Sequence, residues 1–155
     1  MSPFSYVLLP VAHVQQRGES DCLVACVDMV LKYLNAPMDY QRLFKALRTN
    51  EQTGTPFPNI QRLEKLGITV VFQQGTLFQL YKFLQNGWPV IRPVKTQELH
   101  HWEMDTDHAV VVVGMDDQWV YINDPAFARA PIPVAHGDFD LAWLERDEYY
   151  AVLAP

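Results

Sequence analysis

The chain has 155 residues, of which 49% are hydrophobic and 19% are charged. This length suits one globular domain of roughly 100–200 residues, so we expect residues 1–155 to form a single domain. The hydrophobic content excludes an intrinsically disordered chain, and 7 glycines and 11 prolines without a repeat exclude a collagen-like one. A net charge of −6 with no run of Lys or Arg argues against binding to nucleic acid or to an anionic membrane.

The only two cysteines, Cys22 and Cys26, are four residues apart. They are too few for a disulfide framework, and no second Cys or His pair has zinc-finger spacing, so we expect reduced thiols in a reducing compartment. Residues 1–10 lack the basic start of a signal peptide, and no stretch reaches the roughly 18 apolar residues of a membrane span. We therefore expect a cytoplasmic protein with no membrane span.

The first half of the chain predicts mainly helices. Residues 6–14 are apolar and predict a strand or extended segment, and residues 22–34 predict a core helix with one narrow polar face, formed by Asp28 and Lys32. Caps and breakers mark the helix ends: Asp21 is expected to cap the core helix, Asp39 a second helix, and Thr76 with Gln79 a later one, with Gly67 and Gly87 at helix C-termini.

The second half of the chain predicts mainly strands. The expected strands cover residues 68–72, 89–94, 108–114, 119–123, 131–134 and 149–153, with the proline-containing segment 131–134 at a sheet edge. Asp138 is expected to cap one short helix that runs through Leu144. Helices followed by strands indicate an α+β fold.

Cys22 is expected in the first turn of the core helix. A helix N-terminus carries partial positive charge and free N–H groups, which stabilise a thiolate, the reactive form of cysteine. Most cysteines are buried and inert, and for Cys22 that alternative stays open on position alone. For Cys26, one turn later inside the apolar run, we favour the inert alternative.

His108 and Asp124 are the candidate partners of Cys22. A thiol nucleophile needs a base within hydrogen-bond reach, and His108 is the one histidine of five that begins a predicted core strand. If this strand and the next form a hairpin that turns near Asp116, Asp124 lies almost opposite His108, where Cβ atoms are about 4.5–5.5 Å apart. A carboxylate there would orient the imidazole and stabilise its charged form. A histidine at a strand end and a turn-forming Asp are the plainer alternatives.

Two polar segments flank these candidates. Gln16, six residues before Cys22, could donate to an oxyanion together with the Cys22 backbone N–H, and on composition Gln15 is an equal candidate. Residues 100–107 contain metal-ligand residue types but no predicted helix or strand to fix their geometry, so we favour a wet acidic loop and predict no metal or other cofactor. If this loop borders the site, its charge would favour basic substrates.

The ordered set of these residues resembles the double-glycine leader peptidases that process bacteriocins, a group of papain-like cysteine peptidases often fused to ABC transporters. Their pattern is a Gln, then Asp-Cys-Gly-x-x-Cys at the head of a helix, later a His before a hydrophobic strand, and later Asp-Pro. Here Gln16, Asp21-Cys22, His108-Ala-Val-Val-Val-Val-Gly and Asn123-Asp124-Pro125 follow in matching order and spacing. The resemblance covers about residues 11–153.

The resemblance implies a papain-like α+β fold, in which an N-terminal helical half with a central Cys-bearing helix packs on a C-terminal antiparallel sheet. It also implies four catalytic roles: Cys22 as nucleophile, His108 as base and acid, Asp124 as the residue that orients the histidine, and Gln16 in the oxyanion hole. Leu23 stands where transporter-linked members usually have Gly, which changes the space beside the nucleophile. The chain carries no membrane or ATPase segment, so it resembles a stand-alone member.

These observations predict a cysteine hydrolase, most simply a peptidase acting on a peptide or protein substrate through a Cys-His-Asp triad. Two alternatives remain open. The same triad runs acyl transfer or deamidation on related folds. A catalytically silent member of the same fold would bind peptides without cutting them.

Overall fold

The structure, a computed structural model, describes residues 4–155 and is built around one antiparallel sheet of seven strands. The strands are β1 (Val7–Leu8), β2 (Thr69–Gln74), β3 (Val90–Lys95), β4 (Asp107–Met115), β5 (Trp119–Asn123), β6 (Ile132–Ala135) and β7 (Tyr149–Ala154). The helices are α1 (Cys22–Tyr33), α2 (Tyr40–Ala46), α3 (Leu77–Gln85) and α4 (His136–Leu144), with the 3₁₀ helices η1 (Phe57–Leu66) and η2 (Thr96–Glu98). None of the helices among residues 4–155 is long and apolar enough to cross a membrane.

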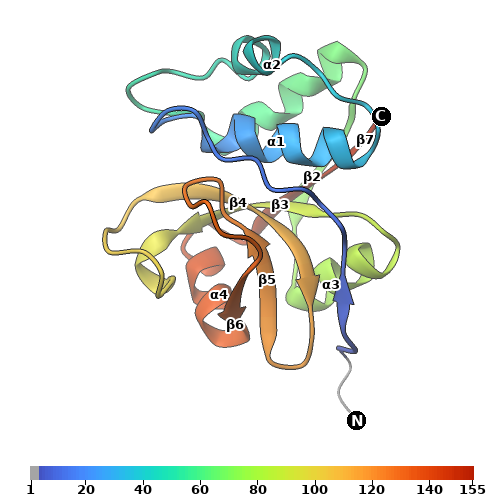
Figure 1. The fold of residues 1–155 in the computed structure, drawn as a ribbon, viewed down its shortest axis with the longest axis vertical. Coiled ribbons are helices and arrows are strands. Elements are labelled where there is room, and N and C mark those ends of the chain that lie inside the picture. Colours follow the sequence, from blue (N-terminus) through green and yellow to red (C-terminus); the bar gives the residue numbers. More distant parts are fainter. Residues whose placement is uncertain (1–3) are drawn as a thin grey trace.

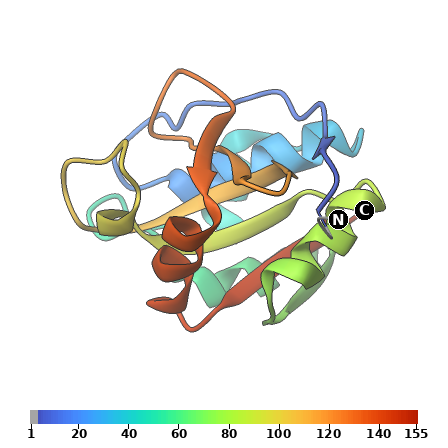
Figure 2. The same cartoon turned by 90° about the horizontal axis from the view of Figure 1, so that it is seen from below.

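Helices cover both faces of the sheet. Figure 1 shows α1 and α2 on one face, with α3 and α4 on the other, and Figure 2 shows α3 and α4 in front of the strands. Alternate residues of β4 enter two apolar clusters, with Val111 and Val113 packing toward α1 and Val110 and Val112 toward α3 and α4. Because both faces of β4 are buried, its sequence is a continuous apolar run and does not alternate between apolar and polar residues.

The strand order is β2-β7-β3-β4-β5-β6, so the last strand of the chain lies inside the sheet and β6 lies at an edge, as expected. Of the apolar segment 6–14, only Val7 and Leu8 pair as a strand, with Met115 and Gly114 of β4. A Cβ atom at position 114 would lie 2.5 Å from the Val7 carbonyl oxygen, so this close approach of two backbones requires a glycine.

The core helix is confirmed, and it is more deeply buried than its sequence suggests. Residues 23–31 of α1 are all buried. Asp28 is among them, and its carboxylate lies 3.0 Å from the exposed ammonium of Lys32. The expected polar face is therefore reduced to the end of the Lys32 side chain.

The expected cap at Asp21 is wrong. Its carboxylate makes no bond to the first turn of α1 and instead accepts from the backbone N–H groups of Arg17 at 3.0 Å and Gly18 at 2.7 Å, and from the Tyr40 hydroxyl. The preceding loop folds back on Asp21 and supplies the two backbone donors, and α2 supplies the Tyr40 hydroxyl, in place of the helix N–H groups. Asp21 therefore shapes the loop that carries Gln16.

The other helix ends follow the sequence more closely. Asp39 caps α2 by accepting from the Arg42 N–H at 3.1 Å, and Thr76 and Gln79 form the expected capping box at α3. Helix α4 starts at His136, two residues before Asp138, because β6 runs directly into the helix. Asp138 thus lies in the first turn of α4, and the prediction that it is the cap is wrong.

Candidate functional site

A cleft of about 1150 Å³ opens where the start of α1 meets the start of β4. Cys22, the first residue of α1, is partly exposed in its wall, and Gln16, Trp102 and His108 line it as well. The cleft lies between the helical layer and the sheet, at the end of the molecule where the residue 96–107 loop, yellow in Figure 1, projects. The fold therefore brings Gln16, Cys22 and His108, which the sequence analysis singled out, to one cleft.

The His108 ring interacts with both Asp124 and Cys22. Its Nε2 lies 2.7 Å from Asp124 Oδ1, and Cys22 is close enough to act on its pKa. Since Nε2 faces the carboxylate, Nδ1 is the nitrogen left for the sulfur. Burial alone lowers the pKa of His108, but the interactions with Asp124 and Cys22 outweigh it and raise this pKa to about 9. The imidazole is therefore held in its charged form at neutral pH.

Asp124 reaches His108 diagonally rather than from directly opposite. Asn123 pairs with Val111, so the same register places Asp124 beside Val110, two residues from His108. Asp124 is not directly opposite for two reasons. Asp116 opens the turn instead of lying at its centre, and its carboxylate accepts from the backbone N–H groups of Gln118 and Trp119. The register of β4 and β5 also shifts by one residue between Val112 and Gly114. An offset of two keeps both side chains on one face, and diagonal neighbours remain within reach.

The Asp124 carboxylate is fully buried and accepts four hydrogen bonds. Oδ1 accepts from His108 Nε2 and from the Ala126 backbone N–H at 3.0 Å. Oδ2 accepts from His101 Nε2 at 2.9 Å and from Trp102 Nε1 at 2.8 Å. Burial raises the pKa of Asp124, but the bonds from His101 and His108 outweigh it and hold this pKa well below its usual range. Asp124 is therefore an anion throughout the neutral pH range.

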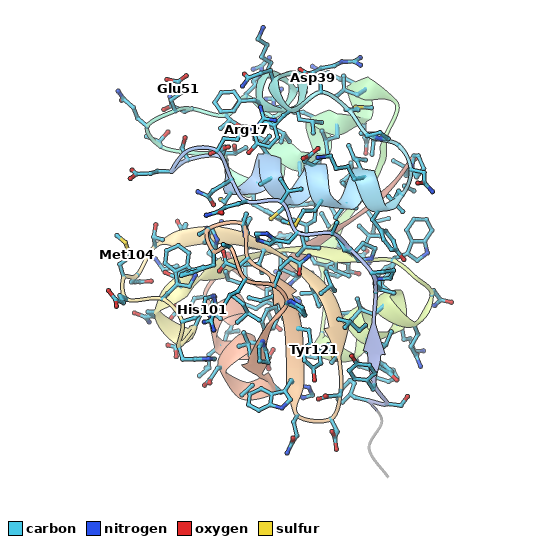
Figure 3. All side chains as sticks on the ribbon, viewed as in Figure 1. Arg17, Asp39, Glu51, His101, Met104 and Tyr121 are labelled. Carbon is cyan, nitrogen blue, oxygen red and sulfur yellow. The ribbon has the colours of Figure 1, made fainter. Side chains whose placement is uncertain are left out.

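His101 and Trp102 correct the expectation of a wet loop at residues 100–107. The His101 side chain is fully buried against Asp124, and the Trp102 ring packs edge-on against His108 with 4.8 Å between centroids. The rest of the loop is largely exposed, at His100 and again from Glu103 onward, where Met104 lies at the outer edge of the molecule in Figure 3. The sequence analysis missed both residues, and the one available signal was an aromatic residue inside an otherwise polar segment.

Gln16 is held in the wall of the cleft by its own loop and by the chain that follows β5. Its backbone N–H donates to the Pro125 carbonyl at 2.8 Å, and its side-chain Nε2 donates to the Gly18 carbonyl at 2.7 Å. An amide nitrogen carries two N–H groups, so one donor remains after the bond to Gly18. Gln15 also lines the cleft but is more exposed than Gln16.

The charges around the cleft are partly compensated. Lys95 Nζ lies 3.6 Å from both Asp105 and Asp107, and Arg146 lies 3.4 Å from Asp107. Glu51 projects from the helical layer on the same side of the molecule as Met104 (Figure 3). Less of the loop's negative charge is therefore free than its sequence suggests, and the preference for basic substrates stays a prediction.

Among the residues that the structure describes, the remaining thiol and metal-ligand side chains form no second centre. Cys26 is fully buried, and burial together with the charges of Cys22 and Asp124 raises its pKa well above the ordinary value. It is therefore a protonated, structural thiol. Within residues 4–155, no three side chains of the His, Cys, Asp and Glu types are grouped so that they could hold a metal ion.

Comparison with known protein families gives one match over most of the chain. The model described as "Peptidase C39 family" matches residues 11–146. Among curated proteins, the lactococcin-G-processing and transport ATP-binding protein LagD of Lactococcus lactis subsp. lactis is 26% identical over 131 residues, which is 84% of this chain. The chain spans only 17% of the length of that relative.

Solved structures share the fold. A C39-like peptidase from Bacillus anthracis has a TM-score of 0.78 at 23% identity, over 97% of this chain and 98% of that one. The peptidase domain of Streptococcus ComA, an ABC transporter, has a TM-score of 0.73 at 23% identity, over 94% and 98%. A double-glycine motif protease from an AMS/PCAT transporter, in complex with its leader peptide, has a TM-score of 0.72 at 17% identity, over 100% and 99%. These matches confirm the expected α+β, papain-like fold class.

Proposed function

The chain belongs to the peptidase C39 family, a family of cysteine peptidases. We propose that it cleaves peptide bonds through a triad of Cys22, His108 and Asp124. The observation that carries this proposal is the position of His108, which lines one cleft with Cys22 and is hydrogen-bonded to Asp124 at 2.7 Å. A thiol, an imidazole and a carboxylate in this order supply the nucleophile, the base and the group that orients the base in acyl transfer.

Cys22 is activated as the thiolate of an ion pair with His108. The His108 imidazolium carries the proton on Nδ1, toward the sulfur, and is stabilised by the anionic Asp124 carboxylate at Nε2. The thiolate lies at the N-terminus of the twelve-residue helix α1, where the helix dipole and free backbone N–H groups favour negative charge. The thiolate then attacks the carbonyl carbon of the substrate peptide bond.

Gln16 completes the site as an oxyanion donor. The tetrahedral intermediate carries its negative charge on the former carbonyl oxygen, and we assign its stabilisation to the free N–H of the Gln16 amide and the backbone N–H of Cys22. As the first residue of a helix, Cys22 has no intrahelical acceptor for that N–H. His108 next protonates the leaving amine, and water hydrolyses the thioester that remains on Cys22.

The substrate is a peptide or an extended protein segment. Two observations support this class: the cleft is open along the boundary of two layers, and a protease of the same fold has been solved with a leader peptide bound. Leu23, whose side chain is buried next to Cys22, also lines the cleft. We expect it to alter selection of the residues flanking the cleaved bond relative to transporter-linked members.

A two-part experiment tests this function without a known substrate. The rate at which iodoacetamide alkylates Cys22 is measured from pH 5 to 9 by mass spectrometry, in the wild type and in His108→Ala. We expect Cys22 to react rapidly below neutral pH, to slow markedly in His108→Ala, and Cys26 to stay unmodified in both. Ordinary thiol pH dependence of an accessible Cys22, with no effect of His108, would overturn the proposal.

The second part exposes a peptide library to the wild type and to Cys22→Ala. A hydrolase gives fragments that differ from their parent by one added water, and only in the wild type. An acyltransferase gives a fragment joined to an amine, and a deamidase gives uncut peptides heavier by about 1 Da. Binding of the same peptides by both variants without any product would identify a silent binding module instead.

A further inference from the structure

We infer that His101 is a positioning residue of this site, which holds the Asp124 carboxylate in the orientation that presents Oδ1 to His108. The inference rests on the proposed triad and adds to it a second histidine. His101 Nε2 lies 2.9 Å from Asp124 Oδ2, on the oxygen that His108 does not use. The two histidines therefore bond to opposite oxygens of one carboxylate.

Two donors on Oδ2 fix the plane of the carboxylate. The outer torsion angle of an Asp side chain is broad, so a carboxylate with only one strong partner can turn. Here Trp102 Nε1 donates to Oδ2 at 2.8 Å beside His101 Nε2, while Oδ1 accepts from His108 and from the Ala126 N–H. Rotation of the carboxylate would break all of these bonds together.

The His101 ring is itself held in place by packing. Its centroid lies 5.0 Å from that of Phe127 in an edge-on contact, and Phe127 also contacts Trp102 at 5.3 Å. The Phe127 backbone N–H donates to the Asp124 carbonyl at 3.2 Å, so the chain after Asp124 turns back toward both rings. The donors to Oδ2 thus belong to one packed unit rather than to a mobile loop.

The His101 ring makes one hydrogen bond, to Asp124. Its Nδ1 is buried and has no partner among residues 4–155. A carboxylate only accepts, so Nε2 carries the proton, and a second proton on Nδ1 would be a buried donor without an acceptor. The Nε2–H group of His101 therefore donates its one hydrogen bond to the oxygen of Asp124 that His108 does not use.

The test compares two substitutions that differ in one N–H group. His101→Phe keeps a ring against Phe127 but removes the donor, whereas His101→Gln places an amide N–H near the position of Nε2. Each variant is assayed for Cys22 alkylation at pH 6.5, and for kcat and KM on a peptide that the wild type cleaves. Thermal unfolding of each variant is recorded as well.

We expect His101→Phe to lower kcat and the alkylation rate on the order of 10-fold, the value of one buried hydrogen bond, with KM changed less than about twofold. We expect His101→Gln to recover most of this loss. Unchanged rates in His101→Phe would overturn the inference. So would equal losses in both variants, because they would mean that His101 matters only for packing.

A measurement on the wild type does not depend on the variants folding. ¹⁵N NMR of the histidine rings reports which nitrogen carries a proton, and we expect Nε2 of His101 to carry one, because it donates to Asp124. A proton on Nδ1 instead would overturn the inference. Failure of the triad itself looks different: Cys22 of the wild type would show no enhanced reactivity, and His108→Ala would not change it.

Discussion

Asp124 lies two register positions from His108 across the β4–β5 pair, and its Oδ1 is nevertheless 2.7 Å from His108 Nε2. The diagonal placement leaves the far oxygen of the carboxylate open to residues of another segment, His101 and Trp102. The Asp124 carboxylate therefore bonds both to His108 of the sheet and to His101 and Trp102 of the loop that borders the cleft. Its four donors make Asp124 important for stability as well as for the proposed chemistry.

Asp124→Asn tests this double role. An asparagine offers one oxygen and one NH₂ group, so the NH₂ group must face either the His108 and Ala126 donors or the His101 and Trp102 donors. Because buried donors are then left unpaired, we expect the free energy of unfolding at pH 7 to fall by about 2–4 kcal/mol and Cys22 alkylation below pH 7 to slow. Urea unfolding measures the first effect.

Asp117→Asn is the matched control, since Asp117 is an exposed residue of the turn before β5, and we expect it to change stability by less than about 0.5 kcal/mol. Equal stability of Asp124→Asn and the wild type would mean that the four bonds contribute nothing net. The pKa of Asp124 is lowered, so its contribution is present above the ordinary carboxyl pKa of about 3.9 and is lost as pH falls below it.

The raised pKa of His108 predicts a loss of stability in alkali. A histidine whose folded pKa exceeds its unfolded value stabilises the protein fully below the unfolded pKa, here 6.5, and loses that contribution as pH rises to about 9. We expect the free energy of unfolding to fall by roughly 2–3 kcal/mol over this interval. The decline should be absent in His108→Gln and present in a variant of the exposed His100, His100→Gln. A flat profile in the wild type would contradict it.

Local sequence patterns predict the parts of the site that depend on short-range structure. The apolar run after Asp21 places Cys22 at a helix start, and the strand that begins at His108 follows from hydropathy alone. The network around Asp124 could not be predicted in this way. His101 and Asp124 are 23 residues apart and meet only because β5 lies beside β4 and the 96–107 loop folds over its end.

Two errors have physical causes that composition does not reveal. Asp21 could have bonded either to α1 or to its own preceding loop, and the Tyr40 hydroxyl, contributed by α2, favours the second arrangement. The offset between His108 and Asp124 depends on where the hairpin turns, where Asp116 bonds to Gln118 and Trp119, and on the register shift between Val112 and Gly114. In both cases an Asp side chain bonds to nearby backbone N–H groups in a way that the sequence pattern alone does not specify.

Arg92 carries a prediction for the core away from the site. Its side chain is fully buried in β3, with the guanidinium carbon 3.0 Å from the Trp143 ring centroid and 4.7 Å from that of Phe139. None of its side-chain nitrogens has a hydrogen-bond partner among residues 4–155, and burial holds its pKa well below the usual range. Burial of the Arg92 charge without a partner therefore lowers the stability of the folded protein.

We expect Arg92→Met, which keeps much of the volume without the charge, to leave the free energy of unfolding unchanged or to raise it by about 1–4 kcal/mol. Arg92→Ala should lower it by about 2–5 kcal/mol because it leaves a cavity. Chemical denaturation of both variants makes the comparison. A large destabilisation by Arg92→Met would show instead that contact with the two aromatic rings outweighs the burial of the charge.

Gln16→Ala tests the proposed oxyanion hole directly. Loss of one oxyanion donor lowers kcat on the order of 10²–10³-fold, and we expect this fall with little change in KM. The free energy of unfolding should change by less than about 1 kcal/mol, because the side chain is partly exposed and bonds only to Gly18 of its own loop. Gln15→Ala is the matched control, since Gln15 is the neighbouring amide in the cleft wall. If Gln15→Ala lost the activity and Gln16→Ala kept it, the oxyanion role would belong to Gln15.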